Sequence, residues 1–157
     1  MSRFEPWSEE RTVEIITEHS ALEGPLMPIL HALQHTFGHV PEEAIPVIER
    51  ELNLSRAEVH GVVTFYHDFR RELPGKHVLK LCRAEACQAM GCERLVERAE
   101  DRLGVECGNT SADGRVTLEA VYCLGLCASG PSAMLDGRVV ARLDNTRLDQ
   151  LLKEAQA

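Results

Sequence analysis

The sequence predicts an α+β protein in which an N-terminal helical bundle, residues 1–75, precedes a small α/β domain, residues 76–157. Apolar residues recur at helical spacing through the first part, whereas short alternating apolar runs appear only in the second. Charge divides at the same place, because residues 1–75 carry 6 Lys and Arg against 13 Asp and Glu, while residues 76–157 carry 11 against 12. All six cysteines lie after residue 81, and Pro74-Gly75 is a turn signal at the boundary.

Two helices are expected before residue 40. The side chain of Ser8 is suited to cap the first, which is expected at about 9–20. Gly24-Pro25 precedes the second, whose apolar residues follow the 3.6-residue period until Gly38. Its expected buried face consists of Leu26, Ile29, Leu30, Leu33 and Phe37.

Two further helices complete the expected bundle. Pro41 and the glutamates after it start the third, which Pro46 is expected to bend or break. Ser55 and Glu58 form a capping box at the start of the fourth, which is expected to run to about His67. The first part is therefore expected to be helical throughout.

The second part is expected to contain elements in the order β, α, β, β, β, α. The first strand ends directly at Cys82, and the second ends directly at Cys123. Asp136-Gly137 suits the two-residue turn of a hairpin between the last two strands. The expected strands cover 78–81, 116–122, 133–135 and 139–143, and the expected helices cover 90–103 and 145–154. This order is that of a small α/β sandwich similar to thioredoxin, a likeness that carries no function by itself.

The composition argues against several classes of partner. The formal net charge is −8 and the pI is about 5.4, so binding to nucleic acid is not expected. The chain has no run of about 18 apolar residues, and its first residues include acids where a secretory signal has an apolar stretch. We therefore expect a cytoplasmic protein without direct membrane insertion. In that reducing compartment, six cysteines indicate metal ligands or redox groups rather than structural disulfides.

Four of the cysteines form two pairs, each beginning where an expected strand stops. Cys82 and Cys87 are the first pair, and Cys123 and Cys127 are the second. Loops at strand ends often carry binding sites because the sheet holds their ends in place. The spacing leaves three interpretations open: a [2Fe-2S] cluster with two thiolates to each iron, a zinc ion, or a disulfide or redox-active thiols. The C-x-x-C motif of thioredoxin-type oxidoreductases is absent, which weakens the third interpretation.

The sequence around the second pair resembles a family signature. It reads Asp113-x-x-Val116-Thr117-x5-Cys123-Leu124-Gly125-x-Cys127-x-x-Gly130-Pro131. This run is similar to the signature of the 24 kDa subunit of NADH dehydrogenase (complex I), with Val116 in place of phenylalanine. The first cysteine pair also matches that family, as does the run Ser55-Arg56-Ala57-Glu58-Val59-His60-Gly61-Val62-x-Thr64-Phe65-Tyr66. The resemblance implies a thioredoxin-like [2Fe-2S] ferredoxin domain with one [2Fe-2S] cluster, and it implies the ligands Cys82, Cys87, Cys123 and Cys127.

The resemblance also implies a function. Two stretches, Leu26-x-x-Ile29-Leu30-His31-Ala32-Leu33-Gln34 and Cys82-Arg83-Ala84-Glu85-x-Cys87-Gln88, are most similar to the gamma subunit of soluble NAD-dependent formate dehydrogenases. The expected function is single-electron exchange with an FMN- and NADH-binding partner subunit in such a multi-subunit enzyme. The alternatives are the equivalent subunit of complex I or of an NAD-reducing hydrogenase, or a zinc-binding interaction module. No G-x-G-x-x-G or P-loop motif is present, so the chain is not expected to be catalytic alone.

Charge at the expected site needs compensation. Backbone N–H groups of residues 83–88 and 124–130 are expected to donate to the sulfurs, because a buried anionic cluster is costly without such donors. Arg83 follows the first ligand and is expected either to add positive potential there or to be a solvated surface side chain.

Other residues with metal-binding side chains are expected to be secondary. Cys92 and Cys107 are predicted to be spare, the second as a small buried apolar side chain. His31 and His35 have the i, i+4 spacing of a metal pair but no evident third ligand. Pro131 is predicted to follow a cis peptide bond, as the proline before a strand does in thioredoxin-like folds.

Overall fold

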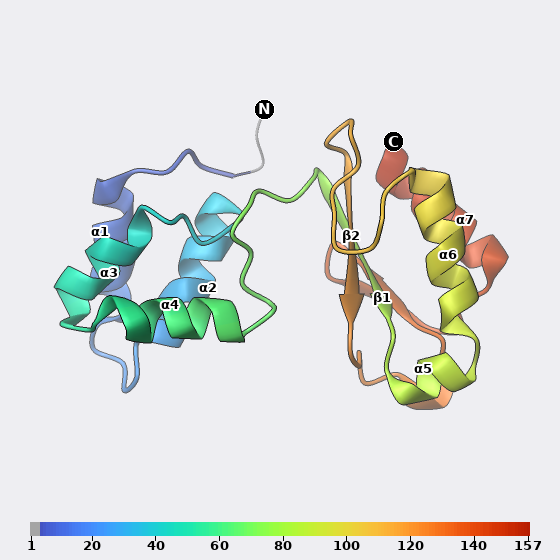
Figure 1. Cartoon of the computed structure of the whole chain (residues 1–157), viewed down its shortest axis with the longest axis horizontal. Helices are drawn as coiled ribbons and strands as arrows, with labels where there is room; N and C mark the ends of the chain where they lie inside the picture. Colours follow the sequence, from blue (N-terminus) through green and yellow to red (C-terminus); the bar gives the residue numbers. More distant parts are fainter. Residues whose placement is uncertain (1–3) are drawn as a thin grey trace. The chain divides into compact units, whose positions relative to one another are not determined.

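The computed structural model describes residues 4–157 and divides into two compact units, with the boundary between Leu73 and Pro74. We call the first the helical unit and the second the cysteine unit (Figure 1). Each unit has an apolar core of its own. The first core is built from helix faces alone, and the second from a sheet and the helices packed on it.

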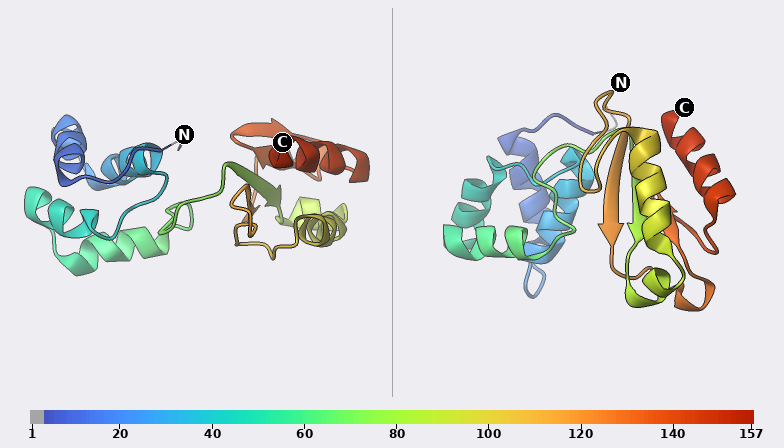
Figure 2. Two further views of the ribbon diagram at one scale, coloured as in Figure 1. Left: turned by 90° about the horizontal axis from the view of Figure 1, so that it is seen from above. Right: turned by 45° about the vertical axis from the view of Figure 1, so that its right-hand side comes forward.

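Four helices form the helical unit within residues 4–73: α1 (Glu9–His19), α2 (Leu26–Phe37), α3 (Ala44–Leu52) and α4 (Arg56–Phe65). Helix α1 packs on α2 and α3, and α3 packs on α4 (Figure 2). The core is mainly aliphatic, and its largest fully buried side chains include Ile15, Ile29, Leu30, Leu33, Phe37 and Ile48. Burying each of these side chains contributes about 1.5–3 kcal/mol to the stability of the folded unit.

The helix ends confirm the predicted caps. The Arg11 N–H donates to Ser8 Oγ at 3.1 Å, and Gly38 ends α2 in the left-handed conformation with φ 81°. The capping box is complete, because the Glu58 N–H donates to Ser55 Oγ at 3.3 Å and the Ser55 N–H donates to the Glu58 carboxylate at 2.8 Å. Local sequence therefore determines where α1 and α4 begin and where α2 ends.

The prediction for α3 was wrong in two respects, because the helix starts after Pro41 and is not broken at Pro46. The helix begins at Ala44 and runs unbroken through Pro46 to Leu52. Pro46 is only the third helical residue, where an N–H has no intrahelical acceptor, so the missing donor costs nothing there. The carbonyl of Pro41 instead accepts the Ala44 N–H at 3.1 Å in a turn that precedes the helix. Helix α4 also ends earlier than predicted, at Phe65.

The cysteine unit, all of which is described from Pro74 to Ala157, has a four-stranded sheet in the order β2-β1-β3-β4. Strand β1 (His77–Cys82) runs parallel to β2 (Val116–Val121) and antiparallel to β3 (Ala133–Leu135). Strand β4 (Arg138–Val140) pairs antiparallel with β3. Helices α6 (Cys92–Leu103) and α7 (Asn145–Gln156) pack on each other and on β1 (Figures 1 and 2). The predicted α+β fold class is confirmed.

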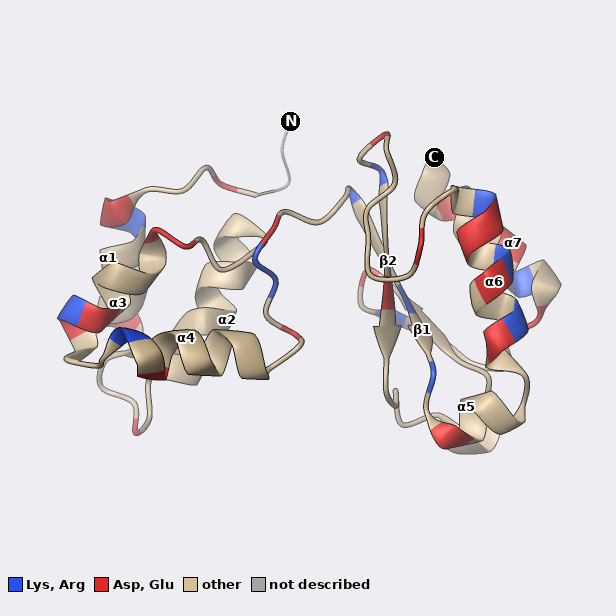
Figure 3. Ribbon diagram, viewed as in Figure 1, with Lys and Arg blue, Asp and Glu red and all other residues tan. Residues whose placement is uncertain are grey.

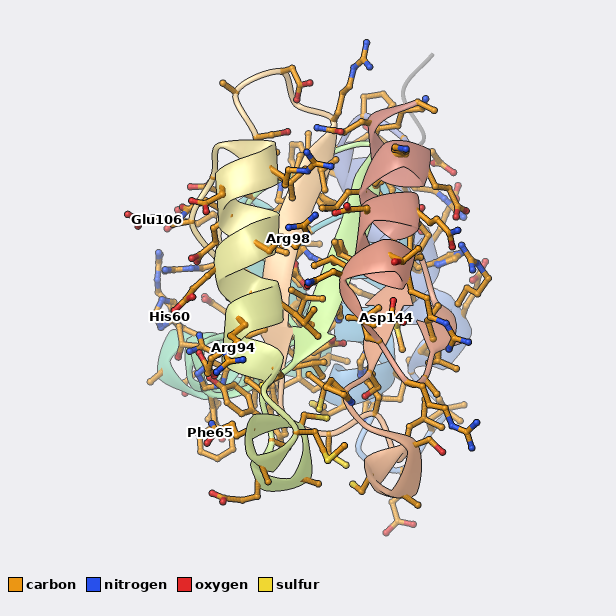
Figure 4. The ribbon with its side chains drawn as sticks, turned by 90° about the vertical axis from the view of Figure 1, so that its right-hand side faces the viewer. His60, Phe65, Arg94, Arg98, Glu106 and Asp144 are labelled. Atoms are coloured by element: carbon orange, nitrogen blue, oxygen red, sulfur yellow. The ribbon has the colours of Figure 1, made fainter. Side chains whose placement is uncertain are left out.

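Helices α6 and α7 are joined by an ion pair as well as by apolar packing. Arg98 on α6 donates through Nε and one terminal nitrogen to Asp149 on α7, at 2.9 and 2.7 Å. The guanidinium lies between the two helices (Figure 4). No helix in residues 4–157 is long and apolar enough to cross a membrane.

Backbone conformation in this unit follows the turn residues. Asp136 and Gly137 have φ 50° and 88°, as the predicted two-residue hairpin requires. The Gly130-Pro131 peptide is cis, as predicted. The helix predicted for 90–103 begins later, at Cys92, because Gly91 adopts φ 84° and separates α6 from a short preceding helix, α5 (Glu85–Ala89).

Candidate metal centre

The parallel pairing of β1 and β2 brings two cysteine-bearing loops to one edge of the sheet. Cys82, the last residue of β1, pairs in register with Val121, the last residue of β2, and Cys123 follows shortly after. The carboxyl ends of parallel neighbours lie at the same edge, so both loops start side by side. Cys87 lies on α5 and Cys127 begins the short helix η1 (Cys127–Ser129), and α5 packs against η1. All four predicted ligands therefore meet at this edge.

The four sulfurs are arranged as two pairs. Cys123 Sγ and Cys127 Sγ are 3.5 Å apart, and the thiols of Cys82 and Cys87 are close enough for each to shift the pKa of the other. The second loop also contacts the first pair, because the backbone N–H groups of Cys123 and Leu124 donate to the Cys82 sulfur. Within residues 4–157, no group of three or more His, Cys, Asp or Glu side chains is arranged as a site for one metal ion. Two thiolate pairs are the ligand pattern of a binuclear cluster.

The pairs differ in exposure. Cys82 and Cys87, which we call the inner pair, are 2% and 1% exposed. Cys123 and Cys127, which we call the outer pair, are exposed on the surface. One side of the candidate site thus lies in the protein interior, and the other side faces outward.

Backbone amides surround the sulfurs largely as predicted. The Ala84 N–H donates to Cys82, and the Gly125 N–H donates to Cys123 Sγ at 3.3 Å. Both donors lie in the two ranges expected from the sequence. Cys123 itself has φ 108°, in a region that costs a non-glycine residue about 1–3 kcal/mol. The fold therefore holds this cysteine in a conformation that its own backbone disfavours.

Burial and hydrogen bonding shift the pKa values of the inner pair in opposite directions. Burial opposes ionisation of Cys82, but the N–H donors and the Cys87 thiol outweigh burial and lower the pKa of Cys82. The pKa of Cys87 is raised by burial and by the neighbouring Cys82 sulfur. The surroundings therefore favour the thiolate of Cys82 and disfavour that of Cys87.

Ser132 is a neighbour of the site that the sequence did not reveal. It is 2% exposed, its Oγ lies 3.7 Å from Cys87 Sγ, and its carbonyl accepts the Cys82 N–H at 3.0 Å. Gly130 is also close, because a Cβ there would lie 3.4 Å from Cys87 Sγ. The one available signal was the position of Ser132 directly after the cis proline, just beyond the family signature.

Charged side chains are absent from the loop that carries the outer pair. The sixteen residues from Ala120 to Leu135 contain no Asp, Glu, Lys or Arg, and the ribbon after β2 is uncharged as far as the β3–β4 hairpin (Figure 3). Arg83 matches neither expectation fully, because Glu93 holds its guanidinium through two hydrogen bonds, at 3.1 and 2.7 Å. That carboxylate offsets the positive charge. Amide dipoles therefore supply most of the compensation for negative sulfur.

The other residues with metal-binding side chains that the sequence singled out lie in different surroundings. Cys92 is the first residue of α6; it is buried beside the inner pair, and burial raises its pKa to about 11. Cys107 is half-buried rather than fully buried, which corrects the prediction, although it does pack on the apolar core. The His31 ring contacts the Phe69 ring in a tilted arrangement, with ring centres 4.9 Å apart and an interplanar angle of 51°.

Sequence comparison places these features in a family. The sequence model of the thioredoxin-like [2Fe-2S] ferredoxin family matches residues 12–156. A subunit of the NADH-quinone oxidoreductase of Pseudomonas aeruginosa is 37% identical over 132 residues, which cover 82% of this chain and 80% of the relative. The corresponding protein of Escherichia coli is 35% identical, over 79% of this chain and 75% of the relative. The NADP-reducing hydrogenase subunit HndA of Solidesulfovibrio fructosivorans is 29% identical, over 90% of this chain and 83% of the relative.

Structural comparison supports the fold. A crystal structure of an NAD+-reducing [NiFe]-hydrogenase in the air-oxidized state aligns with 96% of this chain, with a TM-score of 0.64 and 20% identity. This chain spans only 24% of the length of that hydrogenase chain. At this identity the match shows a shared arrangement of helices and strands, and it carries no further conclusion.

Proposed function

This chain belongs to the thioredoxin-like [2Fe-2S] ferredoxin family, and on that premise we propose that it is an electron-transfer subunit of a multi-subunit NAD(P)-linked oxidoreductase. The family binds a [2Fe-2S] cluster. One observation carries the proposal: the inner and outer pairs lie at one sheet edge, with backbone N–H groups directed at their sulfurs.

Cys82, Cys87, Cys123 and Cys127 are the proposed ligands, and the donor set fits the group. Four thiolates with two ferric ions and two sulfides carry a formal charge of about −2, and one added electron makes it about −3. When bound, the cluster supplies a site for one electron. The chain's own contribution is to exclude water from the inner pair and to direct amide dipoles at Cys82 and Cys123, which lowers the cost of the negative charge.

The proposed parent enzyme is of the complex I or NAD-reducing hydrogenase type. This follows the relatives, which are named as subunits of an NADH-quinone oxidoreductase and of an NADP-reducing hydrogenase. The formate dehydrogenase gamma subunit remains a second candidate, on the two stretches at 26–34 and 82–88 that suggested it. The comparisons support the first candidate better. In either case the chain has no nucleotide-binding motif, so an FMN- and NADH-binding partner subunit is proposed.

A visible absorption spectrum with iron and sulfide analysis tests the cluster. We expect a brown protein with about two irons and two acid-labile sulfides per chain. We also expect an EPR signal after reduction and no NADH oxidation by the isolated chain. A colourless protein that retains one tightly bound zinc would contradict the proposal. The parent enzyme is tested separately, by purifying the native assembly and assaying it with quinone, hydrogen and formate in turn.

A further inference from the structure

We propose that the outer pair, Cys123 and Cys127, is a reversible thiol–disulfide switch that controls metal loading of this site. When the chain holds no iron, exchange with a low-molecular-weight disulfide such as glutathione disulfide joins the two sulfurs. The control of loading rests on the proposed function. The chemistry itself rests only on the positions and exposure of the sulfurs.

Geometry places the outer pair within reach of a disulfide. Their sulfurs are in contact at 3.5 Å, and only three residues separate the two cysteines in the chain. The fold already holds the two ends of this short loop together, so forming the disulfide costs little further conformational entropy. Gly125, at φ 75°, makes the tight turn between them and donates its N–H to Cys123 Sγ.

Exposure selects the outer pair over the inner pair. Thiol–disulfide exchange requires a thiolate to approach an external sulfur directly, so the rate depends on access. Cys123 and Cys127 are exposed, whereas Cys82 and Cys87 are 2% and 1% exposed. Glutathione disulfide therefore reaches the outer sulfurs and not the inner ones.

The exchange proceeds in two balanced steps. The thiolate of one outer cysteine attacks a sulfur of glutathione disulfide, which forms a mixed disulfide and releases one glutathione thiolate. The second outer thiolate then attacks the protein sulfur of that mixed disulfide and releases the second glutathione. The two protein thiols lose two protons and two electrons in total, and glutathione disulfide gains them as two glutathione thiols.

Loading of iron is then conditional on reduction. Cysteine binds metal as a thiolate, so a disulfide removes the outer pair from the donor set and leaves the inner pair alone. A dithiol reductant restores both ligands. The disulfide also keeps these exposed sulfurs from irreversible oxidation to sulfinic acid.

Mass mapping of the iron-free chain tests the switch. The full chain is reduced, freed of reductant without oxygen, incubated with glutathione disulfide, quenched in acid, denatured and labelled with N-ethylmaleimide. We expect two of the six cysteines to escape labelling, and we expect a peptide cross-link between Cys123 and Cys127. Labelled outer cysteines, stable glutathione adducts on both, or an equal yield of a Cys82–Cys87 disulfide would each overturn the proposal.

Variants and metal uptake complete the test. Cys123→Ser is expected to leave Cys127 as a lasting glutathione mixed disulfide, whereas the control Cys107→Ser forms the cross-link normally. The oxidised wild-type chain is expected to take up no iron and sulfide until dithiothreitol is added, and uptake without reductant would refute control of loading. A fully reduced chain that takes up no iron would instead contradict the proposed function, while the cross-link mapping would still stand or fail by itself.

Discussion

The helical unit and the cysteine unit divide stability and chemistry between them. The helical unit buries aliphatic side chains, ends its helices with ordinary caps and carries most of the net negative charge. The cysteine unit has its own core but keeps four thiols, a buried hydroxyl and a cysteine at positive φ at one sheet edge. Local rules account for the helix caps of the first unit. Strained and desolvated groups are concentrated in the second, where the sulfur site lies.

The largest expected effect comes from a substitution at the sulfur site of the cysteine unit. Cys87→Ser is expected to abolish the visible absorption and the EPR signal, because the buried inner pair loses one thiolate and the site cannot hold its second iron. Cys92→Ser, which removes a buried neighbouring thiol, serves as the matched control and is expected to leave both signals unchanged. Full iron content in Cys87→Ser with an unaltered spectrum would show that Cys87 is not a ligand.

The next effect tests whether each unit relies on its own core. Leu33→Ala in α2 is expected to lower the free energy of unfolding of the helical unit by about 2–5 kcal/mol, because it leaves a cavity among fully buried side chains. Far-UV circular dichroism in urea measures the loss, and visible absorption is expected to persist where these helices have unfolded. Leu118→Ala on β2 is the counterpart and is expected to lower the stability of the sulfur site instead. Loss of both signals in one transition for Leu33→Ala would contradict separate cores.

A smaller effect concerns the capping box of α4. Ser55→Ala removes the hydroxyl that accepts the Glu58 N–H, and it is expected to cost the helical unit about 0.5–2 kcal/mol. Urea unfolding followed by circular dichroism measures this cost. Ser55→Thr keeps an acceptor oxygen and is expected to retain most of the stability. Equal loss in both variants would mean that the hydroxyl does not cap the helix.

The smallest expected effect is a pH dependence in the cysteine unit. The side-chain hydrogen bonds from Arg98, and the charges of Arg98 and Arg102, lower the pKa of Asp149 below its usual 3.8. A lowered folded pKa means that the stabilisation is complete above the unfolded value and is lost as pH falls through the folded one. Below pH 3.8, the free energy of unfolding of the iron-free chain is therefore expected to depend less on pH in Asp149→Asn than in the wild-type chain. Arg98→Gln is expected to act in the same way, and an unchanged profile in both would show that the ion pair does not stabilise the folded state.

Much of the fold followed from sequence because its signals are local. The Ser8 cap, the Gly38 end of α2 and the Asp136-Gly137 turn each depend on residues within a few positions of one another. Position within an element was harder to judge. Pro46 is harmless in the first turn of α3, and Gly91 divides a predicted helix, and neither outcome follows from residue type alone.

The sequence by itself determined that two cysteine pairs follow two strands, and the family signature around them indicated the kind of group that they are proposed to hold. Only the tertiary structure decided which pair is buried, where the amide dipoles point, and that Ser132 lies against Cys87. It also decided that Glu93 offsets Arg83. The physical reason is the separation along the chain of the residues that interact. Caps and turns are set by neighbours in the chain, whereas burial and electrostatic compensation depend on segments that meet only when β1 and β2 pair and bring both loops to one edge.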